Sequence, residues 1–213
     1  MLRSFIAALA LSLAGLAGAA QAADTPPDVL ARTTTQEVLA VLKQDRDIRN
    51  GDMSRVYQLV EAKILPNFDF NRMTQLAVGK NWPRASAKQK QALVAEFRNL
   101  LVRTYSASLI AFNNQSVEFK PFTMKPDDED VIVRTEIRQP GGQPIPIDYN
   151  MYKTAFGWKV YDVSIDSVSL VTNYRASFAT TVRQNGIDGL IKTLADQSAR
   201  AATSGKPAAR PGS

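Results

Sequence analysis

The 213-residue sequence contains no cysteine and no histidine. Without cysteine, the protein has no disulfide bonds, thiol catalysis, iron–sulfur clusters or thiolate zinc sites. Without histidine, it has neither the Ser-His-Asp and Cys-His catalytic arrangements nor the commonest general base near neutral pH. Any enzyme built from this chain would depend on carboxylates, lysines, tyrosines or hydroxyls. The composition therefore favours a binding protein.

The two ends of the chain differ in composition from the part between them. Arg3 precedes the apolar run FIAALALSLAGLAG, which is followed by the small-x-small pattern of Ala20-Gln21-Ala22. This pattern predicts a signal peptide over residues 1–22, cleaved on export to a periplasm. The alternative, a membrane anchor, needs about 20 apolar residues, and this run is shorter. Residues 198–213 hold three basic residues and no acidic or large apolar one, which predicts a disordered basic tail.

The region between these ends, residues 23–197, is predicted to form one domain that begins with helices over residues 26–112. Tandem prolines at Pro26 and Pro27 favour a helix start. Further helices are expected from Asp52 to Pro66 and from Asp69 to Gly79, the latter with a glycine in the C-terminal capping position. Ser86 and Gln89 form a capping-box pattern before the longest predicted helix, which extends to about residue 112.

The apolar period then changes from helical spacing to alternation, which predicts a sheet over residues 116–166. Turns at 140–142 and 155–157 separate the expected strands, which follow one another as an antiparallel meander. Two closing helices are expected within residues 170–197, one to about Gln184 and one from Ile187. The predicted fold is α+β, with a curved four-stranded antiparallel sheet covered by helices.

Several acidic residues are candidates for a calcium site or for a catalytic base. The run Asp127-Asp128-Glu129-Asp130 lacks the spacing and glycine of a calcium loop, so a solvated hairpin tip is the expected structure. A carboxylate at Asp148, Asp162 or Asp166 could act as a base in an apolar cavity, as in small isomerases. Asp162 is equally well explained as an acceptor of backbone hydrogen bonds. No metal site, cofactor or nucleotide-binding motif is expected, and no basic stripe with interleaved aromatics indicates a nucleic-acid partner.

Three runs carry a family resemblance: FDFNRMTQLAVGKNW (68–82), AEFRNLLVRTY (95–105) and GWKVYDVSIDSVSLVTNYRASF (157–178). In these runs the sequence resembles the MlaC family, the periplasmic phospholipid-binding proteins of the Mla lipid-asymmetry system, also called the toluene-tolerance family. One departure is Ser167, at a position where the family pattern has glycine. The resemblance implies a nuclear-transport-factor-like sheet and a carrier that shuttles a glycerophospholipid between the two envelope membranes. It also implies two partners, an outer-membrane lipoprotein–porin complex and an inner-membrane ABC transporter with an MCE-domain subunit.

The resemblance places a lipid pocket between the sheet and the helices, and the apolar pattern suggests which residues line it. Equally, these residues could simply fill a closed hydrophobic core. For the phosphate group, Arg175 is the first candidate and Arg103 the second, because a guanidinium binds phosphate in a bidentate manner. Each arginine could instead form an ordinary surface ion pair. The predicted lining residues are Leu76, Phe97, Leu100, Leu101, Tyr105, Leu109, Val133, Ile147, Tyr149, Met151, Trp158, Val160, Val171, Tyr174 and Phe178.

Overall fold

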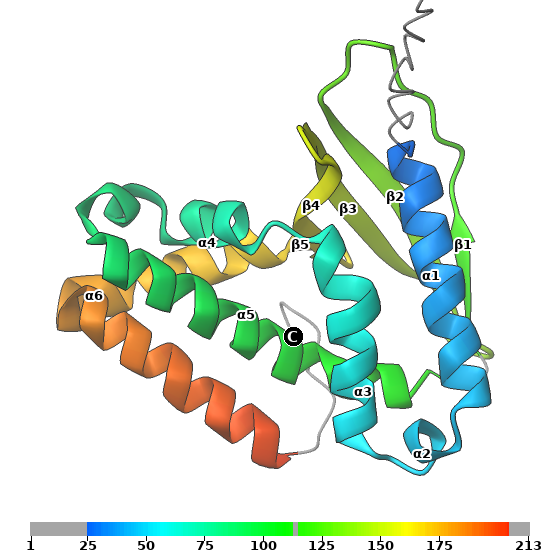
Figure 1. Cartoon of the computed structure of the whole chain (residues 1–213), viewed down its shortest axis with the longest axis horizontal. Helices are drawn as coiled ribbons and strands as arrows, with labels where there is room; N and C mark the ends of the chain where they lie inside the picture. Colours follow the sequence, from blue (N-terminus) through cyan, green and yellow to red (C-terminus); the bar gives the residue numbers. More distant parts are fainter. Residues whose placement is uncertain (1–24, 113–114, 205–213) are drawn as a thin grey trace, which may run out of the picture.

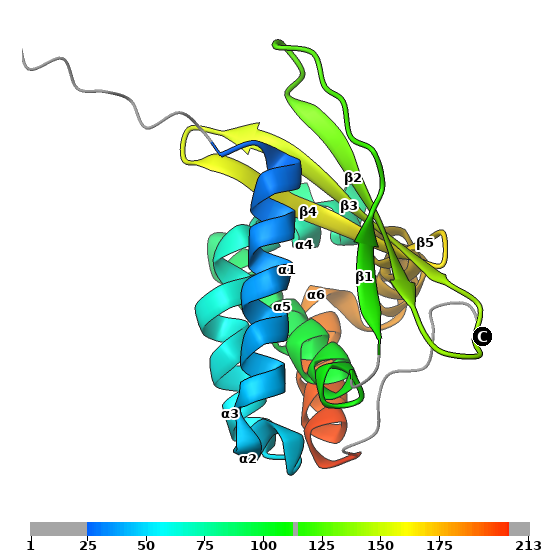
Figure 2. The same cartoon turned by 90° about the vertical axis from the view of Figure 1, so that its right-hand side faces the viewer.

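The computed structural model describes residues 25–112 and 115–204, so the predicted signal peptide lies outside the described residues. Figure 1 shows a twisted antiparallel sheet standing beside a group of helices, and Figure 2 shows the helices on one side of it. The helical part consists of α1 (Pro27–Gln44), α2 (Arg46–Arg49), α3 (Met53–Leu59), the π-helix η1 (Val60–Ile64), the 3-10 helix η2 (Leu65–Asn67), α4 (Phe70–Val78), the 3-10 helix η3 (Gly79–Arg84) and α5 (Ala87–Ile110).

The predicted capping signals act as expected at α4 and α5. The Ser86 side chain accepts a hydrogen bond from the Gln89 backbone N–H, and the Gln89 side chain accepts one from the Ser86 N–H. Gly79 ends α4 with φ 58°, a backbone conformation that glycine adopts without steric cost. The segment predicted as one helix from Asp52 to Pro66 instead changes from α to π to 3-10 geometry along its length.

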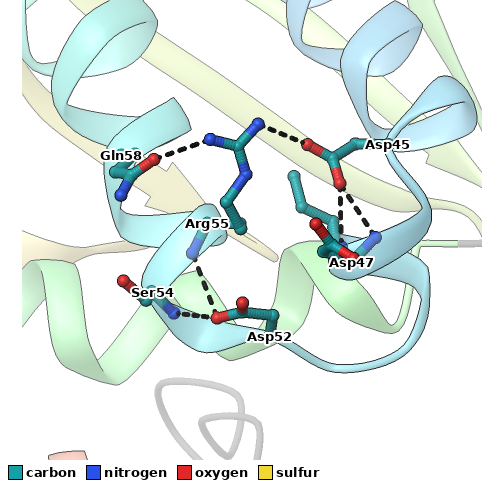
Figure 3. Close-up of polar contacts among 7 residues, drawn as sticks. Asp45, Asp47, Asp52, Ser54, Arg55 and Gln58 are labelled. Carbon is teal, nitrogen blue, oxygen red and sulfur yellow. Dashed lines mark hydrogen bonds and ion pairs between the residues drawn. The ribbon is translucent and has the colours of Figure 1, made fainter.

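Two acidic caps fix the corner where α1 leads into α2 and α3 (Figure 3). Asp45 Oδ1 accepts hydrogen bonds from the backbone N–H groups of Asp47 and Ile48, at 2.9 and 3.2 Å. Asp52 Oδ1 does the same for Ser54 and Arg55 at the start of α3. The Arg55 guanidinium joins the two turns, because it donates to Asp45 Oδ2 at 2.9 Å and to the Gln58 side chain at 2.8 Å.

The sheet has five strands in sequence order rather than the four predicted. They are β1 (Ser116–Phe119), β2 (Asp130–Arg138), β3 (Ile145–Thr154), β4 (Gly157–Ile165) and the two-residue β5 (Val168–Ser169). The predicted lining residues on β3 pair with the inward side of β2, with Tyr149 opposite Val133 and Ile147 opposite Thr135. A bulge between Asn150 and Met151 shifts the register with β4 and increases the local twist.

The fifth strand depends on a tight turn after β4. Asp166 and Ser167 have φ angles of 53° and 65°, in the left-handed region that side chains other than glycine adopt at a cost. Ser167 is the position where the resemblance predicted glycine. The turn is nevertheless formed, and it brings β5 back beside β4.

The closing helices form one element, α6 (Leu170–Ser204), bent at Gly186, which has φ 71° and ψ −176°. The bend lies where the sequence predicted a break between two helices. The helix continues beyond residue 197, and Ser198 is buried at 5% exposure. The structure differs here from the predicted disordered tail, because residues 198–204 continue the helix and Ser198 is buried. The remainder of the predicted tail, residues 205–213, lies outside the described residues.

Candidate functional site

The hydrophobic interior is divided into two clusters. The first, called the main cluster, lies between the sheet and helices α4 to α6, with residues such as Phe97, Val133 and Leu190 fully buried. The second, called the corner cluster, joins α1, α2 and α3 to the end of α5 and consists mostly of aliphatic side chains. The main cluster corresponds to the layer where the lipid pocket is expected.

The structure brings the predicted lining residues together in the main cluster, with one exception. Leu109 packs against the corner cluster instead, because α5 passes between both clusters and its last turns face α3. The other predicted lining residues in the main cluster are Leu76, Phe97, Leu100, Leu101, Tyr105, Val133, Ile147, Tyr149, Met151, Trp158, Val160, Val171, Tyr174 and Phe178.

Within the main cluster, the predicted lining residues differ in exposure. Phe97 is fully buried, and its ring packs edge-on against Tyr174 and Phe178, with centroids 5.1 and 5.2 Å away. Such contacts are those of a closed core. By contrast, Leu76, Tyr105, Ile147, Tyr149 and Tyr174 are only half-buried. The half-buried group marks where solvent reaches the layer between sheet and helices.

Three of these half-buried side chains are tyrosines with desolvated hydroxyls. Burial raises the pKa of Tyr105, Tyr149 and Tyr174, and the neighbouring Tyr174 adds to the shift of Tyr105. For Tyr149 a hydrogen bond with Thr135 acts in the opposite direction. All three hydroxyls therefore stay protonated and neutral at physiological pH. The layer offers apolar rings and uncharged hydroxyls, a lining compatible with an apolar ligand.

The two candidate phosphate-binding arginines have different surroundings. Arg175 is exposed on α6, and its Nε donates to the Leu76 carbonyl oxygen at 2.9 Å, near the end of α4. Arg175 also lines an open groove of about 540 Å³ between the α4–η3 segment and α6, which the sequence analysis did not identify. Arg103 is half-buried on α5, and its side chain forms no ion pair within the described part of the chain.

The candidate catalytic carboxylates have structural roles instead. Asp162 is 8% exposed and accepts hydrogen bonds from Ser169 Oγ at 2.5 Å and from the Val171 backbone N–H at 3.1 Å. It therefore holds the start of α6 against β4. Asp148 faces Arg134 across the strands, with a 3.9 Å ion pair, and Asp166 lies in the β4–β5 turn. Among residues 25–112 and 115–204, no group of three acidic side chains could hold a metal ion.

A polar contact that the sequence analysis missed joins α4 to the outer face of the sheet. The Arg72 guanidinium lies over the rings of Tyr152 and Tyr161, 3.8 and 4.3 Å from their centroids. Arg72 also pairs with Asp130 at 3.5 Å, and the Tyr161 hydroxyl donates to the same carboxylate at 2.8 Å. Burial, followed by the hydrogen bond to Asp130, raises the pKa of Tyr161 to about 12. The FDFNR run carries part of the family resemblance, but nothing in its local pattern indicated that Arg72 contacts the sheet.

The same region explains the acidic run at 127–130. Asp130 is engaged by Arg72 and Tyr161, and Asp128 accepts a hydrogen bond from the Lys125 backbone N–H at 2.7 Å. These contacts order a turn ahead of β2, as expected for a hairpin tip.

None of the helices within residues 25–112 and 115–204 combines the length and the apolar character that a membrane span requires.

The geometry defines a class of protein: an α+β domain in which a twisted antiparallel sheet and a helical layer enclose a neutral, aromatic-rich apolar cluster. Comparison with known proteins gives the family. The family model described as "MlaC protein" matches residues 32–196, and the chain belongs to the MlaC family.

Curated relatives and a solved structure are similar over most of the chain. The toluene tolerance protein Ttg2D of Pseudomonas putida is 28% identical over 175 residues, which cover 81% of this chain and 80% of that protein. The intermembrane phospholipid transport system binding protein MlaC of Haemophilus influenzae is 24% identical, with coverages of 81% and 82%. A phospholipid-binding protein from Ralstonia solanacearum, solved in complex with a phospholipid, is 38% identical, with a TM-score of 0.79 and coverages of 84% and 100%.

Proposed function

We propose that this protein is a periplasmic carrier that holds the acyl chains of a glycerophospholipid between its sheet and its helices. The observation that carries the proposal is the likeness to the phospholipid-bound Ralstonia protein. That protein is 38% identical to this chain, and the match covers all of that protein and 84% of this chain. The main cluster also supports the proposal, because its neutral, aromatic-rich side chains lie between the sheet and the helices, the layer that the resemblance suggests for the lipid.

The physical demand on such a carrier is large. Two acyl chains of about 16 carbons contain roughly 30 methylenes, and exposing them to water costs about 24 kcal/mol at 0.8 kcal/mol each. At about 25 cal/mol per Å², the protein must supply roughly 1,000 Å² of apolar surface. Because Phe97, Val133 and Met151 are closed from solvent, cargo binding requires the sheet and helices to separate along the half-buried side chains.

The proposed lining is the set of predicted residues gathered in the main cluster, without Leu109. Tyr105, Ile147, Tyr149 and Tyr174 are the side chains that an acyl chain contacts first, since they already have accessible surface. The neutral hydroxyls of the three tyrosines allow a polar contact near the glycerol without placing a charge beside hydrocarbon.

The carrier exchanges its lipid with membrane complexes on either side of the periplasm, and the expected partners are those of the Mla system: an outer-membrane lipoprotein–porin complex and an inner-membrane ABC transporter with an MCE-domain subunit. The name of the Haemophilus relative, an intermembrane phospholipid transport system binding protein, supports this role. Export depends on cleavage of the signal peptide predicted over residues 1–22. The catalytic alternative is disfavoured, because the buried Asp162 already satisfies two donors of its own fold.

Native mass spectrometry of the protein purified without detergent tests the proposal. A stoichiometric mass excess that solvent extraction identifies as glycerophospholipid is the expected result. A mass without cargo, unchanged after incubation with phosphatidylethanolamine and phosphatidylglycerol vesicles, would refute it.

A matched pair of variants locates the cargo. Ile147→Lys places a charge on the inner face of β3, whereas Ile132→Lys makes the same change on β2 at a side chain that is 38% exposed. The first variant is expected to lose the lipid and the second to keep it, with circular dichroism confirming that both are folded. If instead Asp148→Ala abolished turnover of an apolar substrate while lipid still bound, the enzyme hypothesis would replace the carrier.

A further inference from the structure

The open groove beside η3 lies at the edge of the main cluster, with which it shares Leu76, Val78 and Trp82. Its walls come from the end of α4, the η3 segment and the first half of α6, which the close contacts among these elements hold together. Leu76, Trp82 and Pro83 supply apolar surface, and Lys80 and Arg175 supply positive charge. Its volume of about 540 Å³ is enough for a small polar group together with part of an apolar chain.

The charged residues that line the groove, Lys80 and Arg175, are of one sign, and the nearest acidic contact is that of Asp188 with the Gln89 side chain. Neither residues 70–95 nor residues 167–187, the two stretches that form its surroundings, contain an aspartate or glutamate. Lys80 and Arg84 are exposed, and the Lys90 ammonium lies 5.4 Å from the centre of the Trp82 ring. Arg175 uses its Nε for the Leu76 carbonyl. In the described chain, none of these four cations forms an ion pair.

Basic residues on the sheet are arranged differently. Lys120 pairs with Glu118 and Glu136, and Arg138 pairs with the same two carboxylates. Arg134 faces Asp148. The charges of Lys120, Arg134 and Arg138 are therefore neutralised within the fold, whereas that of the groove is available to an external anion.

We propose that this groove docks the protein on the surface of an anionic phospholipid bilayer. A half-buried tryptophan surrounded by lysine and arginine matches the membrane interface, where an amphipathic ring lies among headgroups and basic side chains meet phosphates. The concave apolar floor accepts the glycerol region of one lipid, while Lys80 and Arg175 meet its phosphate. Leu76 packs against the main cluster from the groove side, so docking places the bilayer next to the proposed cargo layer.

Vesicle flotation tests this proposal, with the secreted protein mixed with phosphatidylcholine vesicles that contain either none or about one third phosphatidylglycerol. Binding is expected only to the anionic vesicles and is expected to fall steeply with salt. Lys80→Glu combined with Lys90→Glu is expected to weaken binding by at least about 25-fold, since each lysine near an anionic surface contributes roughly a factor of five.

A charge-matched control separates a docking site from general attraction. Lys43→Glu combined with Arg49→Glu makes the same change in net charge at exposed positions of the α1–α2 corner. This control is expected to bind within about twofold of the unmodified protein, because exposed charges more than about 8 Å from the surface are screened at physiological salt. Equal losses in the two double variants would overturn the proposal.

The fluorescence of Trp82 gives the orientation of the bound protein. Lipids brominated on their acyl chains are expected to quench part of the emission, and Trp82→Phe is expected to remove that part and leave the signal of Trp158, which is 4% exposed. Quenching that persists in Trp82→Phe would contradict docking through the groove.

Two further results separate this proposal from others. Soluble polyglutamate that bound the unmodified protein but not the Lys80/Lys90 variant, while anionic vesicles bound neither, would indicate an acidic protein partner and overturn bilayer docking. Docking is independent of the carrier proposal, because the Lys80/Lys90 variant is expected to keep its co-purified lipid in native mass spectrometry.

Discussion

The main cluster and the corner cluster differ in the side chains that close their edges. The corner cluster is closed by aliphatic residues such as Val38, Val56 and Leu59 and is fixed at its edge by the Asp45 and Asp52 caps joined through Arg55 (Figure 3). The main cluster combines a closed aromatic centre with a half-buried rim of neutral tyrosines. The difference predicts that the layer between sheet and helices opens more readily than the helical corner, as the proposed cargo site requires.

The largest expected effect is that of Phe97→Ala at the centre of the main cluster. Phe97 is fully buried between Tyr174 and Phe178, so its loss is expected to lower the free energy of unfolding by about 3–5 kcal/mol. The control Val56→Ala, also fully buried but in the corner cluster, is expected to lose about 2 kcal/mol. Urea unfolding of the lipid-free proteins measures both values.

Added phospholipid sharpens that comparison. Lipid that occupies the main cluster is expected to raise the midpoint of thermal unfolding of both variants, since a ligand that binds only the folded state stabilises it. In Phe97→Ala the ligand also fills the vacated volume, so its midpoint should rise more than that of Val56→Ala. Equal shifts would mean that the cargo does not reach Phe97.

A second prediction concerns the polar support of the main cluster. Asp162→Ala leaves the buried Val171 N–H without its acceptor and is expected to lower the free energy of unfolding by about 2 kcal/mol. The lipid content of the folded fraction, measured by native mass spectrometry, should remain unchanged. Asp148→Ala, with its long ion pair, serves as control and is expected to change stability by less than about 0.5 kcal/mol.

A smaller, pH-dependent effect is expected at the corner. The Ile48 backbone N–H, followed by the Arg55 contact, holds the pKa of Asp45 below its ordinary value. A carboxyl whose pKa is lower in the folded state contributes stability above the unfolded pKa near 4 and loses it as pH falls through the folded pKa. Unfolding midpoints measured from pH 6 down to about pH 2 should therefore decline less steeply for Asp45→Asn than for the unmodified protein. Parallel profiles would show that Asp45 titrates alike in both states.

The smallest expected effect is a gain in stability at the β4–β5 turn. Ser167 has a φ of 65°, so Ser167→Gly relieves backbone strain, while the added chain freedom of glycine in the unfolded state offsets part of the gain. We expect a net stabilisation of about 0.5 kcal/mol by urea unfolding. A loss of stability would mean that the serine side chain compensates for the strain of its backbone.

The local features of the fold could be predicted from the sequence. The Ser86–Gln89 capping box, the glycine that ends α4 and the inward face of β3 follow from near neighbours in the chain, where spacing alone decides the outcome. The lining residues could be grouped because a stripe of apolar residues has one side to bury. The bend at Gly186 could be predicted as a break between two helices, because asparagine followed by glycine is a local signal that ends helices.

Features that depend on distant partners could not be predicted. Leu109 continues the stripe of α5 but meets α3, and only the position of α3 decides to which cluster it belongs. Arg72 lies over the rings of Tyr152 and Tyr161, which follow it by 80 and 89 residues, and Ser198 is buried in a helix that the composition of the tail did not indicate. The basic groove combines residues 75–83 with Arg175 and Ala179, and neither stretch forms a basic stripe in the sequence by itself.

The strand order has a consequence for how the chain acquires its structure. Each strand pairs with the next along the chain, so the sheet forms by closing short loops, one hairpin after another. Helices α4 and α5 precede all of these strands, and the main cluster is completed only by Leu190 and Leu194 near the end of the described chain. As the chain emerges N-terminus first, the apolar face of α5 therefore stays uncovered until almost the whole chain is available, and aggregation is the expected hazard in that interval.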